Sequence, residues 1–243
     1  MSTTTIATSR RASTLDAIVK VGRLHLIDRV SYAVLPWGIL AFTFLVNVVI
    51  FSLVPAPPEG FYTGSLLSIY IFMIVLGVLS MTKAVPFAFT LGVSRRTYYL
   101  GTVGLAVATS AVWAALLTAL WAIEGWTDGW GLQMHLFRVP WVFDGPWYQV
   151  LLTSFVLLVT MFLAGMWYGL ANRRWGIPGV LALTAALVVV VLILIVAIIL
   201  TDSWSAVGRY LGDLDLVGAT GIIALIAVVL GLCGFATIRR ITT

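Results

Sequence analysis

Six long apolar runs constrain this chain more than any other feature of its sequence. They cover residues 33–53, 65–81, 98–123, 147–170, 177–200 and 216–238. As helices rising ~1.5 Å per residue, all six are long enough to cross ~30 Å of hydrocarbon, the second by the smallest margin. The runs are continuous and do not alternate in polarity, so they predict helices rather than the strands of a barrel. We therefore expect an all-α integral membrane protein with six transmembrane helices.

The composition supports a bilayer rather than water as the solvent of this chain. Hydrophobic residues make up 61% of the 243 residues and charged residues 9%, whereas a soluble domain carries about 25% charge. No linker or repeat divides the sequence. We expect one six-helix transmembrane domain over residues 33–243, with residues 1–32 as a separate N-terminal segment.

The N-terminal segment 1–32 combines a Ser/Thr-rich tail with an amphipathic pattern. From residue 14 to 32, apolar residues recur at helical spacing on one side, and the charged residues fall largely elsewhere; the apolar set is Leu15, Ile18, Val19, Gly22, Leu26 and Val30. A basic amphipathic helix before a membrane span is typical of a helix lying in the membrane interface. The alternative is a plain cytosolic juxtamembrane helix.

The distribution of basic residues predicts the orientation of the spans. With both termini and the loop 83–97 in the cytosol, all of the 14 Lys and Arg residues except Arg138 and Arg209 lie on the inner side, as the positive-inside rule requires. The net charge of +5 then reflects topology and does not indicate a nucleic-acid partner. The loops 54–64, 125–146 and 201–215 fall outside.

The outer loops differ in character. The Trp-rich loop 125–146 is typical of interface anchors, with a lid or a partner-binding surface as the alternative. The acidic loop 201–215 is compatible with a short interfacial or re-entrant helical segment.

The sequence shows no pattern of side chains that is typical of a catalytic or cofactor-binding site. His25 and His135 lie on opposite sides of the membrane in this topology, so they do not share a metal. The sequence has no GxxxxGK[ST] phosphate-binding loop, and no central span position carries an ionisable residue. We expect no enzyme activity, no metal and no cofactor in this chain. The polar Asn47 and the Gly165/Gly169 pair predict helix packing.

The stretch Lys83–Gly101 is the internal segment best suited to a soluble partner. Pro86 suits the first turn of a short helix, Gly92 a left-handed termination and Ser94 the cap of the next helix. Positive-inside retention alone is the simpler explanation of the two arginines. The residues that we expect to contact a partner are Pro86, Phe87, Phe89, Leu91, Gly92, Ser94, Arg95 and Arg96.

The order of these features resembles the ABC-2 type family of ABC transporter permease subunits. The segment Leu91-Gly92-Val93-Ser94-Arg95-Arg96-Thr97-Tyr98 is similar to the G-[VI]-[ST]-R-x-x-[FY] turn of bacterial members. In that family an amphipathic connecting helix precedes six spans, and the first cytosolic loop carries a coupling helix that docks on a nucleotide-binding subunit.

The resemblance implies a function for the chain as a whole. It implies a permease subunit of an ATP-driven exporter in a bacterial inner membrane, paired with a second permease copy or a homologue. ATP and Mg²⁺ would be bound by a separate ATPase docked on the loop 83–97. The competing hypotheses are a non-transporting scaffold that recruits a cytosolic partner through the same loop, and a lipid-active membrane enzyme, for which candidate residues are lacking.

Overall fold

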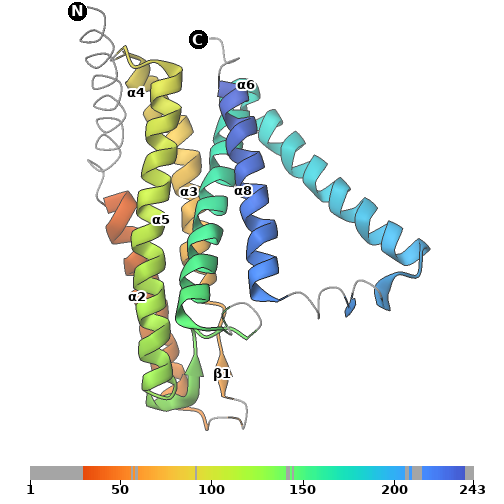
Figure 1. Ribbon diagram of the computed structural model, residues 1–243. Helices are drawn as coiled ribbons and strands as arrows, with labels where there is room; N and C mark the ends of the chain where they lie inside the picture. The colour runs from red at the N-terminus through yellow and green to blue at the C-terminus, as the bar shows by residue number, and fades with distance from the viewer. Residues whose placement is uncertain are drawn as a thin grey trace, which may run out of the picture.

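The computed structural model describes residues 30–55, 57, 60–90, 92–140, 143, 145–205, 208–209 and 215–238. Within these ranges, five helices are long and apolar enough to cross a membrane (Figure 1), which is compatible with a multi-pass membrane protein. They comprise η1 (Val30–Val34) with α2 (Leu35–Ser52); α3 (Leu67–Leu79) with η2 (Ser80–Ala84) and α4 (Val85–Thr90); α5 (Arg95–Trp126); α6 (Trp147–Leu200); and α8 (Leu216–Ile238).

Two predicted segments lie mostly outside the described residues. The N-terminal segment 1–32 is described only from Val30, where η1 begins. The outer loop 201–215 is described at residues 201–205, 208–209 and 215. The amphipathic helix and the re-entrant segment therefore stay predictions.

The second helix is longer than its apolar run. We expected the span 65–81 to be followed by a separate short helix beginning near Pro86. The short helix is present as α4 (Val85–Thr90), but it is not separated from the span. The chain stays helical from Leu67 to Thr90, and the π-helical turn η2 lies directly ahead of Pro86. Proline removes one backbone hydrogen bond and crowds the preceding turn of an α-helix, and a π turn is one of the distortions that accommodates such a disruption. α4 therefore continues the second span instead of standing apart from it.

α6 joins two of the predicted spans. The runs 147–170 and 177–200 were expected to be separated by an inner loop, but only Gly176 leaves the helical conformation, with φ 65° and ψ −157°. Glycine adopts this positive φ at little cost, and Pro178 suits the first turn of the helix that follows. Beyond Gly176 the helix runs away from the bundle (Figure 1). Gly176 alone thus makes the change of direction that we expected a loop to make.

The first part of α6 occupies the centre of the bundle. It contacts α3, α5 and α8, while α2 contacts α3. The residues that α6 buries among these neighbours include Leu158, Phe162, Met166 and Leu170. Within α6, residues 181–200 are almost all exposed. The core therefore lies between α3, α5, α8 and the first half of α6.

The loops at the far end of the bundle from α4 are tied together by backbone pairing. β1 (Phe61–Tyr62) and β2 (Met134–His135) pair in parallel, with Phe61 opposite Met134 and Tyr62 opposite His135. The turn η3 (Gly129–Gln133), in which Trp130 and Gly131 have positive φ, leads directly into β2. This pairing joins the Pro-rich loop 54–64 to the Trp-rich loop 125–146.

The tryptophans of the Trp-rich loop have different environments. Trp126 is 89% exposed and Trp147 is also exposed, so both suit the interface position that we predicted. Trp130 instead packs edge-on against Phe44 of α2, with ring centroids 4.9 Å apart. Trp130 therefore packs against a span.

Candidate functional site

The turn after α4 has the conformation predicted from Gly92. Its φ is +76°. The Gly92 N–H donates to the Phe89 carbonyl (3.0 Å) and the Val93 N–H to the Ala88 carbonyl (3.1 Å). These two bonds form a Schellman motif, in which a left-handed residue lets the chain satisfy the last carbonyls of a helix. The end of α4 is thus a defined structure.

The next helix begins as Ser94 predicted. Ser94 has extended dihedrals (φ −66°, ψ 147°), and its Oγ accepts a hydrogen bond from the Thr97 N–H at 3.2 Å. This side chain satisfies one of the unpaired N–H groups at the start of α5. The described residues between α4 and α5, Gly92 to Ser94, are held by local hydrogen bonds.

Arg95 and Arg96 occupy the first two positions of α5, where they do not help the helix. The N-terminus of a helix carries partial positive charge, so a cation there costs about 0.3–1 kcal/mol. Arg96 is exposed and Arg95 is half-buried. The two guanidinium groups are therefore placed for something other than helix stability, such as membrane orientation or an anionic partner.

The predicted contact residues on α4 divide into two kinds. Phe87 is 54% exposed, and Pro86 is exposed beside it. Ala88 is fully buried, and Phe89 packs against the core, edge-on to the Tyr98 ring at 6.3 Å between centroids. Phe87 is therefore a surface residue, and Phe89 holds α4 to α5. Leu91, which we also assigned to the contact set, lies outside the described residues.

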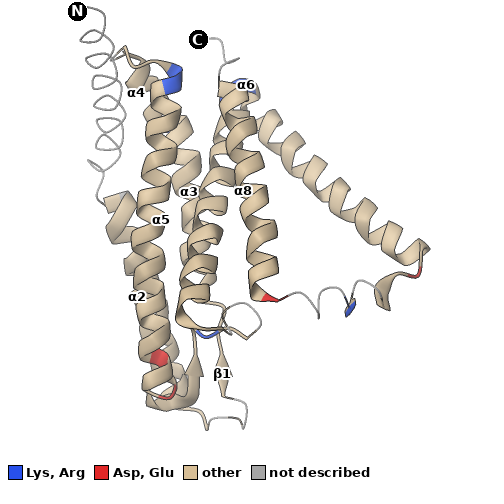
Figure 2. Cartoon of the chain, in the orientation of Figure 1, with Lys and Arg blue, Asp and Glu red and all other residues tan. Residues whose placement is uncertain are grey.

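The described charges separate along the bundle (Figure 2). The α4 end carries five cations: Lys83, Arg95, Arg96, Arg173 and Arg174. The opposite end carries every described acid, namely Glu124, Asp128, Asp202 and Asp215, together with the two remaining described cations, Arg138 and Arg209. The end of the bundle that carries the exposed Phe87 side chain is consequently basic.

The residues assigned to helix packing lie between helices. Asn47 donates from Nδ2 to Ser65 Oγ at 2.8 Å, linking α2 to the segment before α3. Gly165 and Gly169 face the second span: a Cβ at Gly165 would lie 2.0 Å from the Ile74 carbonyl oxygen, and one at Gly169 2.5 Å from Met81 Cβ. The two backbones approach more closely than any side chain would allow, as the Gly-x-x-x-Gly spacing predicted.

Glu124 is a structural residue that the sequence analysis did not single out. Its side chain is fully buried near the end of α5. Oε2 accepts hydrogen bonds from Trp130 Nε1 (3.2 Å) and from the N–H groups of Leu136 (3.0 Å) and Phe137 (2.9 Å), and Oε1 accepts one from the Arg138 N–H (2.9 Å). We call this arrangement the Glu124 clasp. An acid at the end of an apolar run, followed by a loop whose amides need acceptors, was the available signal.

The described residues offer no metal site, because no three His, Cys, Asp or Glu side chains among them come together. Comparison with protein-family models, curated proteins and solved structures finds no match for this chain. What the fold defines is a class: an apolar helical protein with helices suited to a multi-pass membrane position. Any more specific assignment rests on the site itself.

Proposed function

We propose that this chain is the permease subunit of an ATP-driven exporter, with a separate ATPase docked on α4 and the start of α5. In this proposal α6 counts as two spans, which gives six, and the α4 end faces the cytosol of a bacterial cell. The resemblance of the Gly92–Tyr98 turn to ABC-2 permeases supports it. Two copies of the chain, or this chain and a homologue, form the translocation path.

The observation that carries the proposal is the setting of Phe87. It is an exposed aromatic side chain on a helix whose other face is buried through Ala88 and Phe89. α4 is joined to the second span without a break. The second span is also tied to α5 just ahead of α4, because the Tyr98 hydroxyl donates to the Ser80 carbonyl in η2. Displacement of Phe87 by a docked ATPase would therefore move the second and third spans together.

The basic residues at the α4 end suit an acidic surface on the ATPase. A partner pocket that covered the exposed half of the Phe87 ring would gain ~1–2 kcal/mol from apolar burial, and aromatic anchors of this kind often dominate interfaces. Arg95 and Arg96 would contribute mainly to orientation and association rate. Substitutions of Phe87 should therefore change mainly the affinity, and substitutions of Arg95 and Arg96 mainly the association rate.

The test uses the full chain in nanodiscs with the ATPase encoded nearest to it. We expect co-purification and ATP turnover that depends on the chain. Phe87→Asp should weaken the complex about tenfold or more, since it removes the apolar gain and adds charge at a desolvated position. Trp126→Asp is the matched control, because it changes an exposed aromatic residue at the opposite end of the bundle.

The results separate the competing hypotheses. Failure of any ATPase to co-purify, or equal binding by the Phe87→Asp and Trp126→Asp variants, would reject the docking site. Co-purification without chain-dependent ATP turnover would favour a scaffold over a transporter. Phe89 is a poor choice for this test, because its replacement would disturb the contact with Tyr98.

A further inference from the structure

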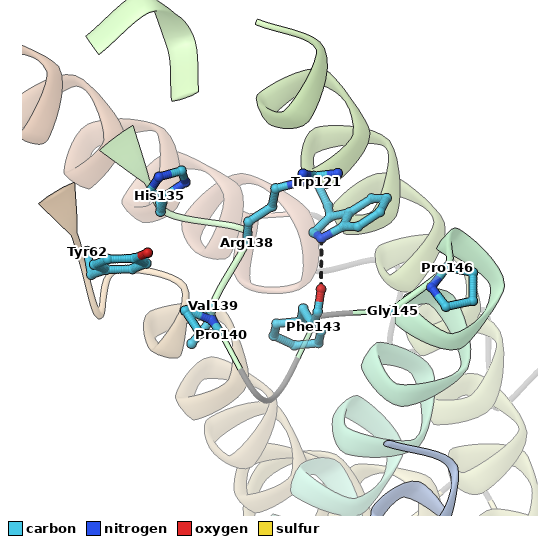
Figure 3. A pocket seen from close by; sticks show the side chains of 9 residues that line it. All are labelled: Tyr62, Trp121, His135, Arg138, Val139, Pro140, Phe143, Gly145 and Pro146. Atoms are coloured by element: carbon cyan, nitrogen blue, oxygen red, sulfur yellow. Dashed lines mark hydrogen bonds between the residues drawn. The ribbon is translucent and has the colours of Figure 1, made fainter. Parts of the chain in front are cut away.

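A cavity of about 490 Å³ opens at the end of the bundle opposite α4. Its walls come from β1, α5, β2 and the segment leading to α6, so segments far apart in the sequence meet there. Figure 3 shows the side chains that give it its chemistry: Tyr62, Trp121, His135, Arg138, Pro140 and Phe143. The volume falls within the range of small-molecule sites, about 300–1,000 Å³.

Arg138 supplies a guanidinium that is already oriented. Its Cζ lies 4.3 Å from the centroid of the Trp121 ring, within the range of a cation–π contact. Trp121 is itself fixed, because its Nε1 donates to the Phe143 carbonyl at 3.1 Å. The guanidinium also lies against Gly125, where a Cβ would come within 2.4 Å of Cζ. Little freedom remains to be lost when a ligand binds this group.

The positive charge of Arg138 is not used by the acid beside it. Glu124 accepts the Arg138 backbone N–H and three other N–H groups, none of them from the guanidinium. Across the described part of the chain, no carboxylate forms an ion pair with the Arg138 side chain. The Glu124 clasp holds the backbone of the cavity wall and leaves the guanidinium donors free for a ligand.

The other side of the cavity is aromatic. The β1–β2 register places Tyr62 opposite His135, and their rings stack with centroids 5.0 Å apart. The imidazole and the Tyr62 hydroxyl are hydrogen-bonding groups at the edge of a ring surface. Phe143 and Pro140 add apolar lining. The cavity thus combines one cation, two further hydrogen-bonding groups and several flat rings.

We propose that this cavity binds a small organic anion, a carboxylate or phosphate carried on an apolar body, with its charged group on Arg138. A guanidinium matches carboxylate and phosphate oxygens with two parallel hydrogen bonds. The walls of Tyr62, Trp121 and Phe143 accept the apolar body. The same chemistry is available from a free amphipathic anion and from the headgroup of an anionic lipid. This site lies at the opposite end from the ATPase surface and does not depend on it.

The test is calorimetric titration of the full chain, in phosphatidylcholine nanodiscs, with phenyl phosphate. Benzyl alcohol serves as the neutral probe and inorganic phosphate as the bare anion. We expect saturable binding of phenyl phosphate that exceeds that of either partial probe. Arg138→Gln should weaken it about tenfold or more, as expected for loss of hydrogen bonds to a charged group. Arg209→Gln, which removes another exposed cation from the same end, should leave it unchanged.

The outcomes are decisive. Absence of saturable binding to the unsubstituted chain, or equal binding by the Arg138→Gln and Arg209→Gln variants, would overturn the site. Amide hydrogen exchange at Leu136 and Phe137 shows whether the Glu124 clasp persists in the Arg138→Gln variant, so that a misfolded loop is not mistaken for a lost ligand contact. Nanodiscs containing phosphatidylglycerol identify the source. Competition with phenyl phosphate that requires Arg138 assigns the site to a lipid headgroup, and undiminished binding assigns it to a free anion.

Discussion

Replacing Glu124 by glutamine should loosen the loop after β2 while keeping the shape of the side chain. If the amide oxygen takes the place of Oε2, its three hydrogen bonds survive as neutral ones, and each is weakened by roughly 0.5 kcal/mol. The amide nitrogen then faces the Arg138 N–H, where Oε1 now accepts a hydrogen bond at 2.9 Å. The Arg138 N–H then has no acceptor, and a buried donor left unpaired costs about 1.5 kcal/mol. The total is about 3 kcal/mol.

Amide hydrogen exchange measures this loss directly. The N–H groups of Leu136, Phe137 and Arg138 exchange only when the clasp opens, so a loss of about 3 kcal/mol should raise their exchange rates about a hundredfold. Asp128→Asn is the matched control, since it makes the same chemical change on an exposed residue of the same loop. Exchange rates in the Glu124→Gln variant equal to those of this control would refute the role assigned to the carboxylate.

Two further predictions concern the helices. Gly165→Ala should destabilise the bundle by about 2–3 kcal/mol, because the new Cβ meets the backbone of the second span, which cannot move aside as a side chain can. Gly104→Ala, where no atom lies within 4 Å of the new Cβ, should leave thermal unfolding in detergent little changed; equal losses in both variants would contradict the close approach. Ser94→Ala should cost about 1 kcal/mol through loss of the helix cap and should speed exchange of the Thr97 amide, whereas an unaltered exchange rate would show that the cap is not needed.

Local backbone chemistry was the most predictable part of this fold. Gly92 and Ser94 sit in motifs whose geometry depends on neighbouring residues alone, so their positive φ and capping bond followed from the sequence. The last helix begins and ends where its apolar run does, at Leu216 and Ile238. The Gly165/Gly169 pair predicted a close helix contact, but only the structure shows that its partner is the second span.

The expectations that failed depended on how long a helix continues. Pro86 was interpreted as the start of a helix separate from the second span, and the segment near Arg173 as a loop. Both interpretations assume that a helix breaker ends a span. The π turn ahead of Pro86 keeps the second span continuous, and at Gly176 a single non-helical residue, rather than a loop, separates the two helical parts of α6.

The Arg138 cavity was beyond sequence reasoning for a different reason. Tyr62 and His135 are brought together by a parallel pairing of only two residues per strand. A strand of two residues is too short to show an alternating pattern in the sequence. The Glu124 clasp likewise depends on the path of a loop. Contacts of this kind are set by tertiary packing.

The π turn at Ser80–Ala84 has a rotational consequence. A π turn holds about one residue more than an α turn, and each residue advances a helix by about 100°. The extra residue therefore changes the angular phase of α4 relative to α3 by about a quarter of a revolution. In an unbroken α-helix, the side of α4 that now carries Phe87 would point in another direction. Gly77 of α3, where an added Cβ would lie 2.2 Å from the Phe162 carbonyl oxygen of α6, would stay where it is. The extra residue in η2 thus lets the second span pack α3 against α6 while α4, at its end, turns a different side outward.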